Sequence, residues 1–354
     1  MPPKNYETLT GLVSRYSPSG EERGAVNWLV DRMHALKYDR AFVDQAGNAV
    51  GILGTGSKHL VLMGHIDTVP GEIEVREENG ILYGRGAVDA KGPLACFVDA
   101  AAVAGPRPGW QVIVIGAVEE ERESDGARYI AGQYKPDFAI VGEPSRWNRV
   151  ALGYKGSAWT QIKITCDHAH SASGQTTAAE HAFAAWSAVS AQAQLFNHGK
   201  KRVFDHLLVS LTEIDTEIGE FVQTAIMHLG VRLPPDLKPS DWKNILSETL
   251  AKLELSHEEI SFSSAPIEAW QSEKNTPLVR AFLSAIRTQG GKPAFVYKTG
   301  TADINLVSPV WKCPAIVYGP GDSALDHTPN EHIDLDEFQN SVAVLSNVLD
   351  ILLT

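Results

Sequence analysis

The sequence predicts an α/β protein: a discontinuous domain with a mixed, mainly parallel sheet flanked by helices, and an α+β domain inserted into it. Two patterns predict this fold. Short apolar runs alternate with helical periodicity in the N-terminal part of the chain and again near its C-terminal end, whereas a β-α-β-β-α-β order fills the middle. Because nearly continuous apolar runs are typical of strands covered on both faces, the first pattern indicates a mainly parallel sheet between helices.

The discontinuous domain is expected at residues 1–153 and 266–354. Its first helix follows Ser19 and Glu22, which have the spacing of a capping box, and apolar residues then recur at helical spacing as far as Leu36. Strands are expected at His59–Met63, Gln111–Ala117, Phe138–Val141 and Ala315–Tyr318, and further helices at Pro93–Ala104 and Phe338–Leu353.

The inserted domain is expected at residues 154–265. The β-α-β-β-α-β order is a compact unit in which two helices cover one face of a sheet. The segments on either side of it are polar or contain Gly and Pro, which is typical of domain boundaries. Its strands and helices are expected, in this order, at Ser157–Cys166, Thr177–Phe196, Leu207–Ile214, Phe221–Leu233, Asp241–Leu253 and Glu259–Ser263.

Composition and charge exclude several classes of function. The chain has 354 residues, which fits two domains, and its net charge of −12 argues against nucleic acid or an anionic membrane as the main partner. Cys96, Cys166 and Cys313 are odd in number and far apart, so we expect no disulfide framework. Since no apolar stretch has the length of a signal peptide or a membrane span, we expect a cytoplasmic protein.

Histidines and carboxylates follow the predicted strands. In open α/β sheets, ligands bind at the carboxyl ends of the strands, so these side chains are expected to meet at one edge of the sheet. A further carboxylate follows a Gly-rich turn and directly precedes a predicted helix. The residues concerned are His65, Asp67, Asp89, Glu119, Glu120, Glu121, Glu143 and His327.

This set of side chains predicts a metal site. Imidazole and carboxylate together suit zinc or a similar ion, and two His with three carboxylates are enough for two ions if one carboxylate bridges them. A further carboxylate can take a proton from the attacking water. Because His65 and Asp67 alternate along an extended segment, Asp67 can orient His65. Each residue alone is better explained as a structural His or a solvated Glu, and the prediction depends on their occurring together.

The motifs resemble those of the two-zinc aminoacylase, deacylase and carboxypeptidase family of metallopeptidases, over the full length of the chain. G-H-I-D-T-V-P at 64–70 and Y-G-R-G-A-V-D-A-K-G at 83–92 resemble its two most specific signatures. The Glu run at 119–121, G-E-P-S at 142–145 and D-H-T-P-N-E at 326–331 resemble the others, in the same order. The resemblance implies that the inserted domain is a lid through which two chains form a homodimer.

The resemblance also implies roles for single residues. His65 and Glu143 match ligands of one zinc, Glu120 and His327 match ligands of the second, and Asp89 matches the carboxylate that bridges them. Cobalt is a possible substitute for zinc. The peptide bond from Asp89 to Ala90 is often cis in this family. Glu119 matches the general base and Asp67 the residue that orients His65.

The Glu run leaves an alternative open. The family has two Glu where this chain has three, so the pair is either 119/120 or 120/121. The spacing from Glu120 to Gly126 favours the pair 119/120. Glu121 is then expected to be a solvated loop residue.

Further roles are implied for the inserted domain and the segment after it. His170 matches a histidine that stabilises the oxyanion in the site of the partner subunit, and Arg232 matches an arginine that binds a substrate carboxylate, a task that suits its forked guanidinium. Lys298 is expected to face the substrate's carboxylate or a carrier protein, beside a binding loop at Thr299–Ala302.

A narrower resemblance concerns the substrate. Y-K-T-G-T-A-D-I-N-L at 297–306 is similar to the branch that releases lysine or ornithine in lysine and arginine biosynthesis. In that branch lysine is attached through its α-amino group to the γ-carboxyl of the C-terminal Glu of a small acidic amino-group carrier protein. An acidic carrier would need a local basic patch on this acidic chain. The candidates are Arg149, Lys155, Lys200, Lys201 and Arg202.

Alternatives remain within and outside this family. The same metal motifs serve N-acetyl-ornithine and N-acyl-amino-acid deacylases, succinyl-diaminopimelate desuccinylases and dipeptidases, and a catalytically inert binding protein on the same fold is a third class. Other enzyme classes are disfavoured because the chain contains neither G-x-S-x-G nor G-x-x-x-x-G-K-[ST].

Overall fold

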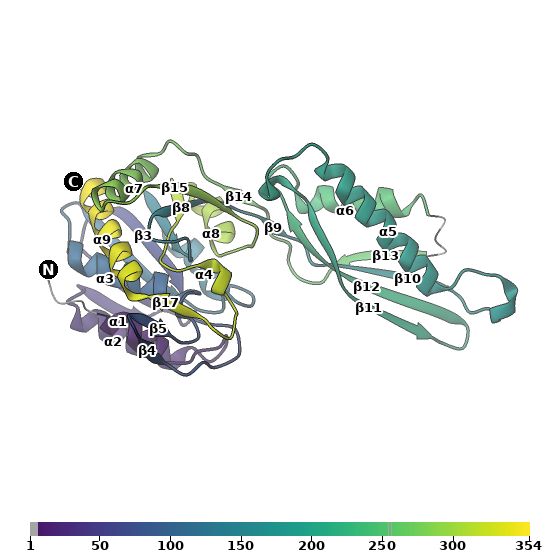
Figure 1. Ribbon diagram of the computed structural model, residues 1–354, viewed down its shortest axis with the longest axis horizontal. Helices are drawn as coiled ribbons and strands as arrows, with labels where there is room; N and C mark the ends of the chain where they lie inside the picture. The colour runs from purple at the N-terminus through teal and green to yellow at the C-terminus, as the bar shows by residue number, and fades with distance from the viewer. Residues whose placement is uncertain (1–5, 254, 256) are drawn as a thin grey trace. The chain divides into compact units, whose positions relative to one another are not determined.

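The computed structural model describes residues 6–253, 255 and 257–354, which form two compact units (Figure 1). The first unit comprises the chain up to Leu152, Ser272–Val296 and Ala302–Thr354. The second comprises Gly153–Gln271 and Tyr297–Thr301. The chain therefore leaves the first unit within one residue of the expected boundary and returns to it six residues later than expected, at Ser272 rather than residue 266.

The main sheet of the first unit has the predicted mixed, mainly parallel character. Its order is β1-β2-β6-β3-β7-β16-β8, and the four central strands β6, β3, β7 and β16 run parallel, with antiparallel neighbours on both sides. The strands are β1 (Arg40–Val43), β2 (Ala49–Leu53), β3 (Lys58–His65), β6 (Trp110–Ala117), β7 (Phe138–Gly142), β16 (Ala315–Val317) and β8 (Arg149–Tyr154).

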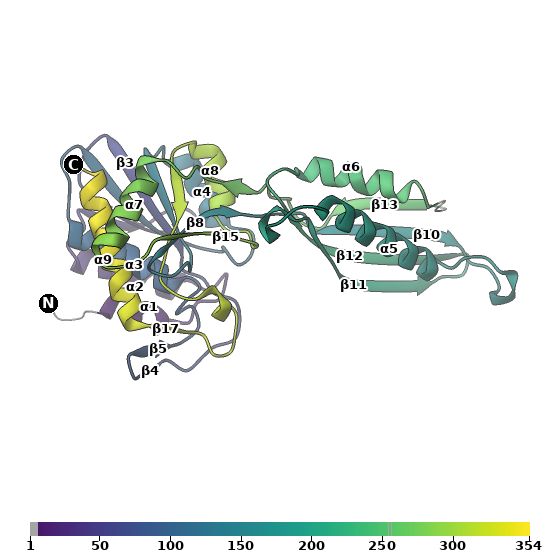
Figure 2. The same ribbon diagram turned by 45° about the horizontal axis from the view of Figure 1, so that its top comes forward.

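Helices pack on this sheet, as Figure 2 shows. Helix α3 contacts β3, β6 and β7, and α9 lies beside α3 and α7. Side chains of two helices crowd Gly116 of β6, where an added Cβ would lie 3.0 Å from Leu29 of α2 and 3.2 Å from Leu94 of α3. The helices of this unit are α1 (Glu7–Val13), α2 (Arg23–Ala35), α3 (Lys91–Ala104), α4 (Asp125–Gln133), α7 (Pro277–Thr288), α8 (Ile304–Trp311) and α9 (Leu335–Leu352).

A small three-stranded sheet brings two distant segments together. Its order is β17-β5-β4, formed by β4 (Arg76–Glu78), β5 (Ile81–Tyr83) and β17 (His332–Asp334). His332 pairs with Tyr83, so the segment before β17 lies beside the Gly-rich turn that follows β5. A short 3₁₀ helix, η3 (Ser323–Leu325), precedes that segment.

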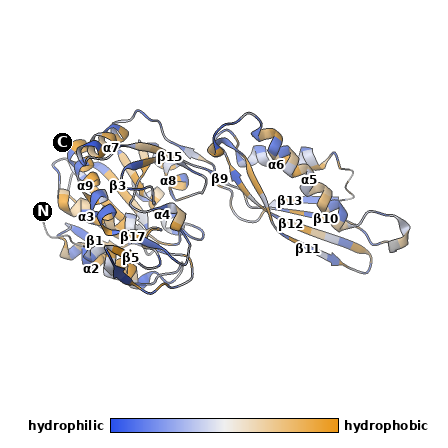
Figure 3. Cartoon of the chain, in the orientation of Figure 1, coloured by the Kyte–Doolittle hydropathy of each residue, from blue (hydrophilic) through white to orange (hydrophobic). Residues whose placement is uncertain are grey.

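The second unit has the predicted β-α-β-β-α-β order. Its antiparallel sheet runs β11-β12-β10-β13, and α5 and α6 pack on it over a core of alternating apolar residues, an alternation that can be followed in Figure 3. The elements are β9 (Gly156–Ser157), β10 (Thr160–Asp167), η1 (Ser171–Ser173), α5 (Ala178–Asn197), η2 (Val203–Asp205), β11 (Leu208–Ile218), β12 (Val222–Leu233), α6 (Pro239–Leu250), β13 (His257–Phe262) and β14 (Trp270–Gln271). Strand β15 (Ala294–Lys298) runs into this unit from the first.

Several elements of the first unit were not anticipated from the sequence, among them α1, α4, α7, α8, β1, β2 and β8. The capping box of α2 is wrong: its N-cap is Glu22, which has no side-chain capping bond, and Ser19 instead donates to Asp67. The spacing of Ser19 and Glu22 thus reflects other contacts. Within the part of the chain that the structure describes, no helix is both long and apolar enough to cross a membrane.

Candidate metal centre

His65 ends β3 and is fixed by the residue two positions further on. Its Nδ1 lies 3.0 Å from the backbone oxygen of Asp67, and a carbonyl oxygen can only accept a hydrogen bond, so Nδ1 carries the proton. The other ring nitrogen, Nε2, is left to bind a metal and lies 3.1 Å from Oδ1 of Asp89. The buried β3 thereby presents a single, oriented ligand atom at its carboxyl end.

Asp89 lies between two histidines. It ends the Gly-rich turn after β5 and precedes α3, and its peptide bond to Ala90 is cis, as the family resemblance implied. Its Oδ1 faces His65, and its Oδ2 lies 3.1 Å from Nε2 of His327. Each carboxylate oxygen therefore faces a different imidazole.

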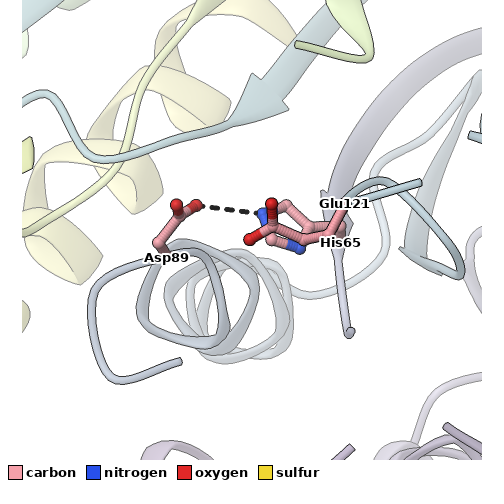
Figure 4. A group of neighbouring side chains, drawn as sticks. All are labelled: His65, Asp89 and Glu121. Carbon is pink, nitrogen blue, oxygen red and sulfur yellow. Dashed lines mark hydrogen bonds and ion pairs between the residues drawn. The ribbon is translucent and has the colours of Figure 1, made fainter. Parts of the chain in front are cut away.

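The Glu run after β6 places Glu121 in the cluster. Its Oε1 lies 3.0 Å from Nε2 of His327, and Glu121 forms with His65 and Asp89 a group whose ligand atoms all lie within 4.8 Å of one another (Figure 4). Glu119, in contrast, adopts a left-handed backbone conformation and donates its N–H to Glu22. These contacts favour the pair 120/121 over the pair 119/120, and Glu121 is not a solvated loop residue.

Asp67 holds the Glu run as well as His65. Its buried carboxylate accepts hydrogen bonds from Ser19 Oγ at 2.7 Å and from the backbone N–H groups of Glu120 and Glu121, each at 3.1 Å. Burial raises the pKa of Asp67, but the interactions with His65 and these donors outweigh it, and the pKa lies below its usual value. Asp67 thus stays ionised and positions both residues that follow Glu119.

This chain resembles known proteins in sequence and in fold. The model of peptidase family M20/M25/M40 matches residues 61–350. This chain belongs to that family. A LysW-lysine hydrolase of Deinococcus radiodurans is 41% identical over 97% of this chain and 95% of its own length. A LysW-lysine/LysW-ornithine hydrolase of Saccharolobus islandicus is 30% identical over 94% and 92%. The crystal structure of a tripeptidase from Staphylococcus aureus, 18% identical, superposes with a TM-score of 0.80 over 98% of this chain and 97% of its own.

The electrostatics of this M20/M25/M40 member fit bound cations. Burial and neighbouring carboxylates raise the pKa values of Glu120 and Glu143 well above their usual range. Burial also raises that of Asp89, but the two histidines outweigh it and keep that carboxylate ionised. The pKa of His327 rises to about 10 because it faces Asp89 and Glu121. Several buried carboxylates with only two imidazoles are an excess of negative charge, which divalent cations would neutralise.

Sequence reasoning missed Asp303, a buried carboxylate beside this cluster. Burial raises its pKa to about 7, against the lowering effects of His65 and of a hydrogen bond with Ser124. Among the residues that the structure describes, nothing bonds its buried Oδ1. The residue stands in the stretch 297–306 that resembles the lysine- and ornithine-releasing branch, which was the available signal. Glu22 and Ser19 were likewise taken for helix-capping residues.

The remaining predicted site residues lie in the second unit. Exposed His170 accepts the N–H of Ala172 through Nδ1 at 3.1 Å. Arg232, at the end of β12, donates from Nη1 to Thr301 Oγ1 at 2.8 Å, which joins the strand to the predicted binding loop. Lys298 ends β15 and is half-buried.

Proposed function

We propose that this chain is a dinuclear-metal amide hydrolase that releases lysine or ornithine from a form blocked at the α-amino group. The observation that carries the proposal is Asp89, whose two oxygens each lie 3.1 Å from a different imidazole, that of His65 and that of His327. One carboxylate shared between two nitrogen ligands is the arrangement expected of a bridge between two ions. The relatives named as LysW-lysine and LysW-ornithine hydrolases support the substrate class.

The contacts support the ligands His65, Asp89, Glu121 and His327, whereas Glu143 is kept from the family resemblance. We assign His65, Asp89 and Glu143 to one zinc, and Asp89, Glu121 and His327 to the second. Glu121 takes the place that the family resemblance gave to Glu120, because Glu121 is the residue whose carboxylate lies beside His327. Nitrogen and oxygen donors of this kind suit Zn²⁺, and Co²⁺ is the substitute to try first.

The chain's own groups supply the proton transfers. When bound, the two ions would polarise the substrate's carbonyl group and acidify the attacking water. We assign the general base to Glu120, because Asp67 fixes its backbone beside the cluster while Glu119 is turned toward Glu22. Glu120 takes a proton from the water and returns it to the leaving α-amine. His170 of a second copy donates a hydrogen bond to the carbonyl oxygen as negative charge develops there.

Arg232 and Lys298 are proposed to bind the substrate's carboxylate. The guanidinium of Arg232 is held by Thr301, so its fork is oriented before substrate arrives. Thr299–Ala302 is the proposed binding loop, and Lys298 directly precedes it.

The proposed carrier protein would bind a narrower basic surface than the sequence suggested. Lys155 is fully buried, and burial lowers its pKa to about 8, so it is not part of a surface patch. Lys200 is paired with Asp236 at 2.8 Å, and Arg202 with Asp205. Lys201 is exposed between them, and we assign the carrier contact to the segment 200–202. Arg149 is exposed on the first unit.

A homodimer through the second unit is also proposed. Two large apolar side chains on α5, Phe183 and Leu195, are 72% and 68% exposed, and β11 is an edge strand. Exposed apolar residues and an open strand edge are features of surfaces that bind a second chain. For the location, the three free thiols support the cytoplasm.

The test is a substrate panel run on metal-free and metal-loaded enzyme. Dialysis against a chelator should abolish hydrolysis, and Zn²⁺ or Co²⁺ should restore it, because the ions supply the carbonyl polarisation. With the zinc enzyme, carrier-linked lysine should be cleaved faster than N-acetyl-lysine, N-acetyl-ornithine, succinyl-diaminopimelate or a dipeptide. Full activity without metal would refute the metal centre, and a dipeptide as the best substrate would refute the substrate class.

A further inference from the structure

Glu331 lies at the centre of the Gly-rich turn that carries Asp89. Its carboxylate is 1% exposed. Oε1 accepts the backbone N–H of Val88 at 2.9 Å and of Asp89 at 3.0 Å, and Oε2 accepts that of Gly86 at 3.1 Å. Oε2 also accepts from Arg85 Nη1 at 2.9 Å. The turn therefore closes around a single buried carboxylate.

These contacts satisfy groups that the fold itself cannot satisfy. A turn between β5 and α3 has no ladder or helix to accept its N–H groups, and buried donors without partners cost free energy. A buried carboxylate in turn requires a counter-charge, which Arg85 provides. Glu331 thus accepts the hydrogen bonds that the turn has to donate, and these bonds together with Arg85 stabilise the buried carboxylate.

Glu331 also joins the two segments that hold Asp89 and His327. It follows His327 by four residues, and its backbone oxygen accepts the N–H of Gly84 at 3.2 Å, at the point where β17 pairs with β5. Arg85 adds a second connection by donating to the backbone oxygen of Thr328 at 3.1 Å. Glu331 and Arg85 together therefore fix the segments that carry Asp89 and His327, whose side chains contact each other in the cluster.

We infer that Glu331 is the positioning residue that aims the two oxygens of Asp89 at two different metal ions. It touches neither metal nor substrate and acts through the backbone of Asp89. The inference rests on the metal centre proposed above. In metal sites, partners that orient a ligand typically contribute about 10- to 100-fold to metal affinity, and we expect Glu331 to do the same.

The test measures metal binding rather than turnover. Metal-free native protein and the variant Glu331→Gln are titrated with Zn²⁺ against a chromophoric chelator, and their thermal unfolding is followed without metal. An amide at this position presents donors to the N–H groups of the turn, so affinity for at least one ion should fall about 10- to 100-fold. The d–d absorption of the Co²⁺-loaded variant should also change.

The matched control is Glu337→Gln. Glu337 is also a buried carboxylate, and it accepts hydrogen bonds from Arg146 Nη1 and from the backbone N–H groups of Trp147 and Gly321, none of them a candidate ligand. It should lose thermal stability while keeping metal affinity within about two-fold. Should Glu331→Gln be poorly folded, Glu331→Asp keeps the charge beside Arg85 but shortens the reach to the turn, and it should still bind metal more weakly.

The outcomes separate the two proposals. If the native protein binds no metal, the metal centre itself is refuted. If the native protein binds two ions and the Glu331 variants bind them equally well, only the positioning role is refuted, and Glu331 merely stabilises the turn.

Discussion

Asp67 shows how one buried carboxylate organises a site without touching substrate. It accepts from Ser19, from the backbone of Glu120 and from the backbone of Glu121, and it lies beside the His65 ring. The backbone of the proposed general base, Glu120, and that of the next residue, Glu121, are therefore held by a single group. Three hydrogen-bond donors and an imidazole ring converge on this buried position, where the oxygens of a carboxylate can accept from them.

This arrangement predicts different effects for the first two Glu of the run. Glu120→Gln should reduce kcat by at least about 100-fold, the usual contribution of a general base, with metal content unchanged. Glu119→Gln should stay within a few-fold of native activity, because the backbone N–H of Glu119 is bound to Glu22 and not to Asp67. Steady-state kinetics and metal analysis of both variants decide between the pairs. A large loss for Glu119→Gln alone would restore the pair 119/120.

A second residue-scale prediction concerns pH and stability. Asp99 on α3 accepts a hydrogen bond from Thr8 of α1, and Arg32 and Glu7 lie nearby. Burial raises its pKa from 3.8 to about 6, so the folded state favours the protonated form. The resulting stabilisation is complete below pH 3.8 and is lost as the pH rises through about 6.

Asp99→Asn should therefore flatten the pH dependence of unfolding. Between pH 5 and 7 the native protein should lose on the order of 1 kcal/mol relative to the variant, since one pKa unit corresponds to about 1.4 kcal/mol. Urea unfolding at both pH values measures this difference, with Asp31→Asn on the exposed face of α2 as control. Equal pH dependence in the native protein and Asp99→Asn would contradict the prediction.

At the residue scale, the sequence pointed to the candidate ligands but not to the residues that position them. His65, Asp89, Glu143 and His327 could be found because each follows a strand or a Gly-rich turn in a recognisable motif. Asp303 and Glu331 could not be assigned, because the sequence does not show that Asp303 is buried beside His65 or which distant backbone groups donate to Glu331. The sequence favoured the pair 119/120, whereas the contact of Glu121 with His327 favours 120/121, since a spacing in sequence does not say which carboxylate faces His327.

At the scale of the element, the candidate site lies at the carboxyl ends of the parallel strands. The four parallel strands were predictable because their apolar runs are nearly continuous, and the chemistry lies where those runs stop. The exposed β1 and the short α1 carry weaker patterns and were not predicted. Ser19 and Glu22 match a capping motif by sequence, yet their side chains bond to Asp67 and to the backbone of Glu119, a tertiary contact that overrides the local one.

The segment before β11 provides a prediction at this scale. Neutralising Lys200, Lys201 and Arg202 to Gln should lower kcat/KM for a carrier-linked substrate by about 10-fold or more at low salt, because an acidic partner loses its attraction. Activity on N-acetyl-lysine should stay unchanged. Lys243 and Lys252, exposed at and beyond α6, are changed to Gln in the control. An equal loss on both substrates would show that the segment serves the fold and not the carrier.

For the whole molecule, the two-unit organisation was predictable to within a few residues, because the middle of the chain changes from alternating βα order to β-α-β-β-α-β. The return segment was not: Tyr297–Thr301 belongs to the second unit although β15 begins in the first. No local pattern marks that crossing, because it is determined by pairing with residues more than a hundred positions away.

The proposed dimer gives a prediction that only two chains together can fulfil. His170→Ala and His65→Ala should each be inactive, since each removes a group from both sites of its homodimer. Equal mixing with subunit exchange should restore about a quarter of native activity, because half of the dimers are mixed and each has one complete site. Adding Phe183→Asp and Leu195→Asp should abolish the restoration. With one variant labelled with ¹⁵N so that mixed dimers can be identified by mass, mixed dimers that remain inactive would place His170 outside the partner's site.

Because the first unit is made of separate stretches of the chain, the ribosome completes its candidate site residues at different times. The segments that carry His65, Asp89, Glu121 and Glu143 all precede the inserted unit, whereas His327, Glu331 and α9 follow it. A growing chain therefore exposes most of its anionic cluster, and completes the inserted unit, before the second histidine emerges. A ribosome-bound intermediate has most of the candidate carboxylates but lacks His327 and Glu331. With the metal centre proposed above, tight metal binding is therefore expected only after the C-terminal segment has emerged.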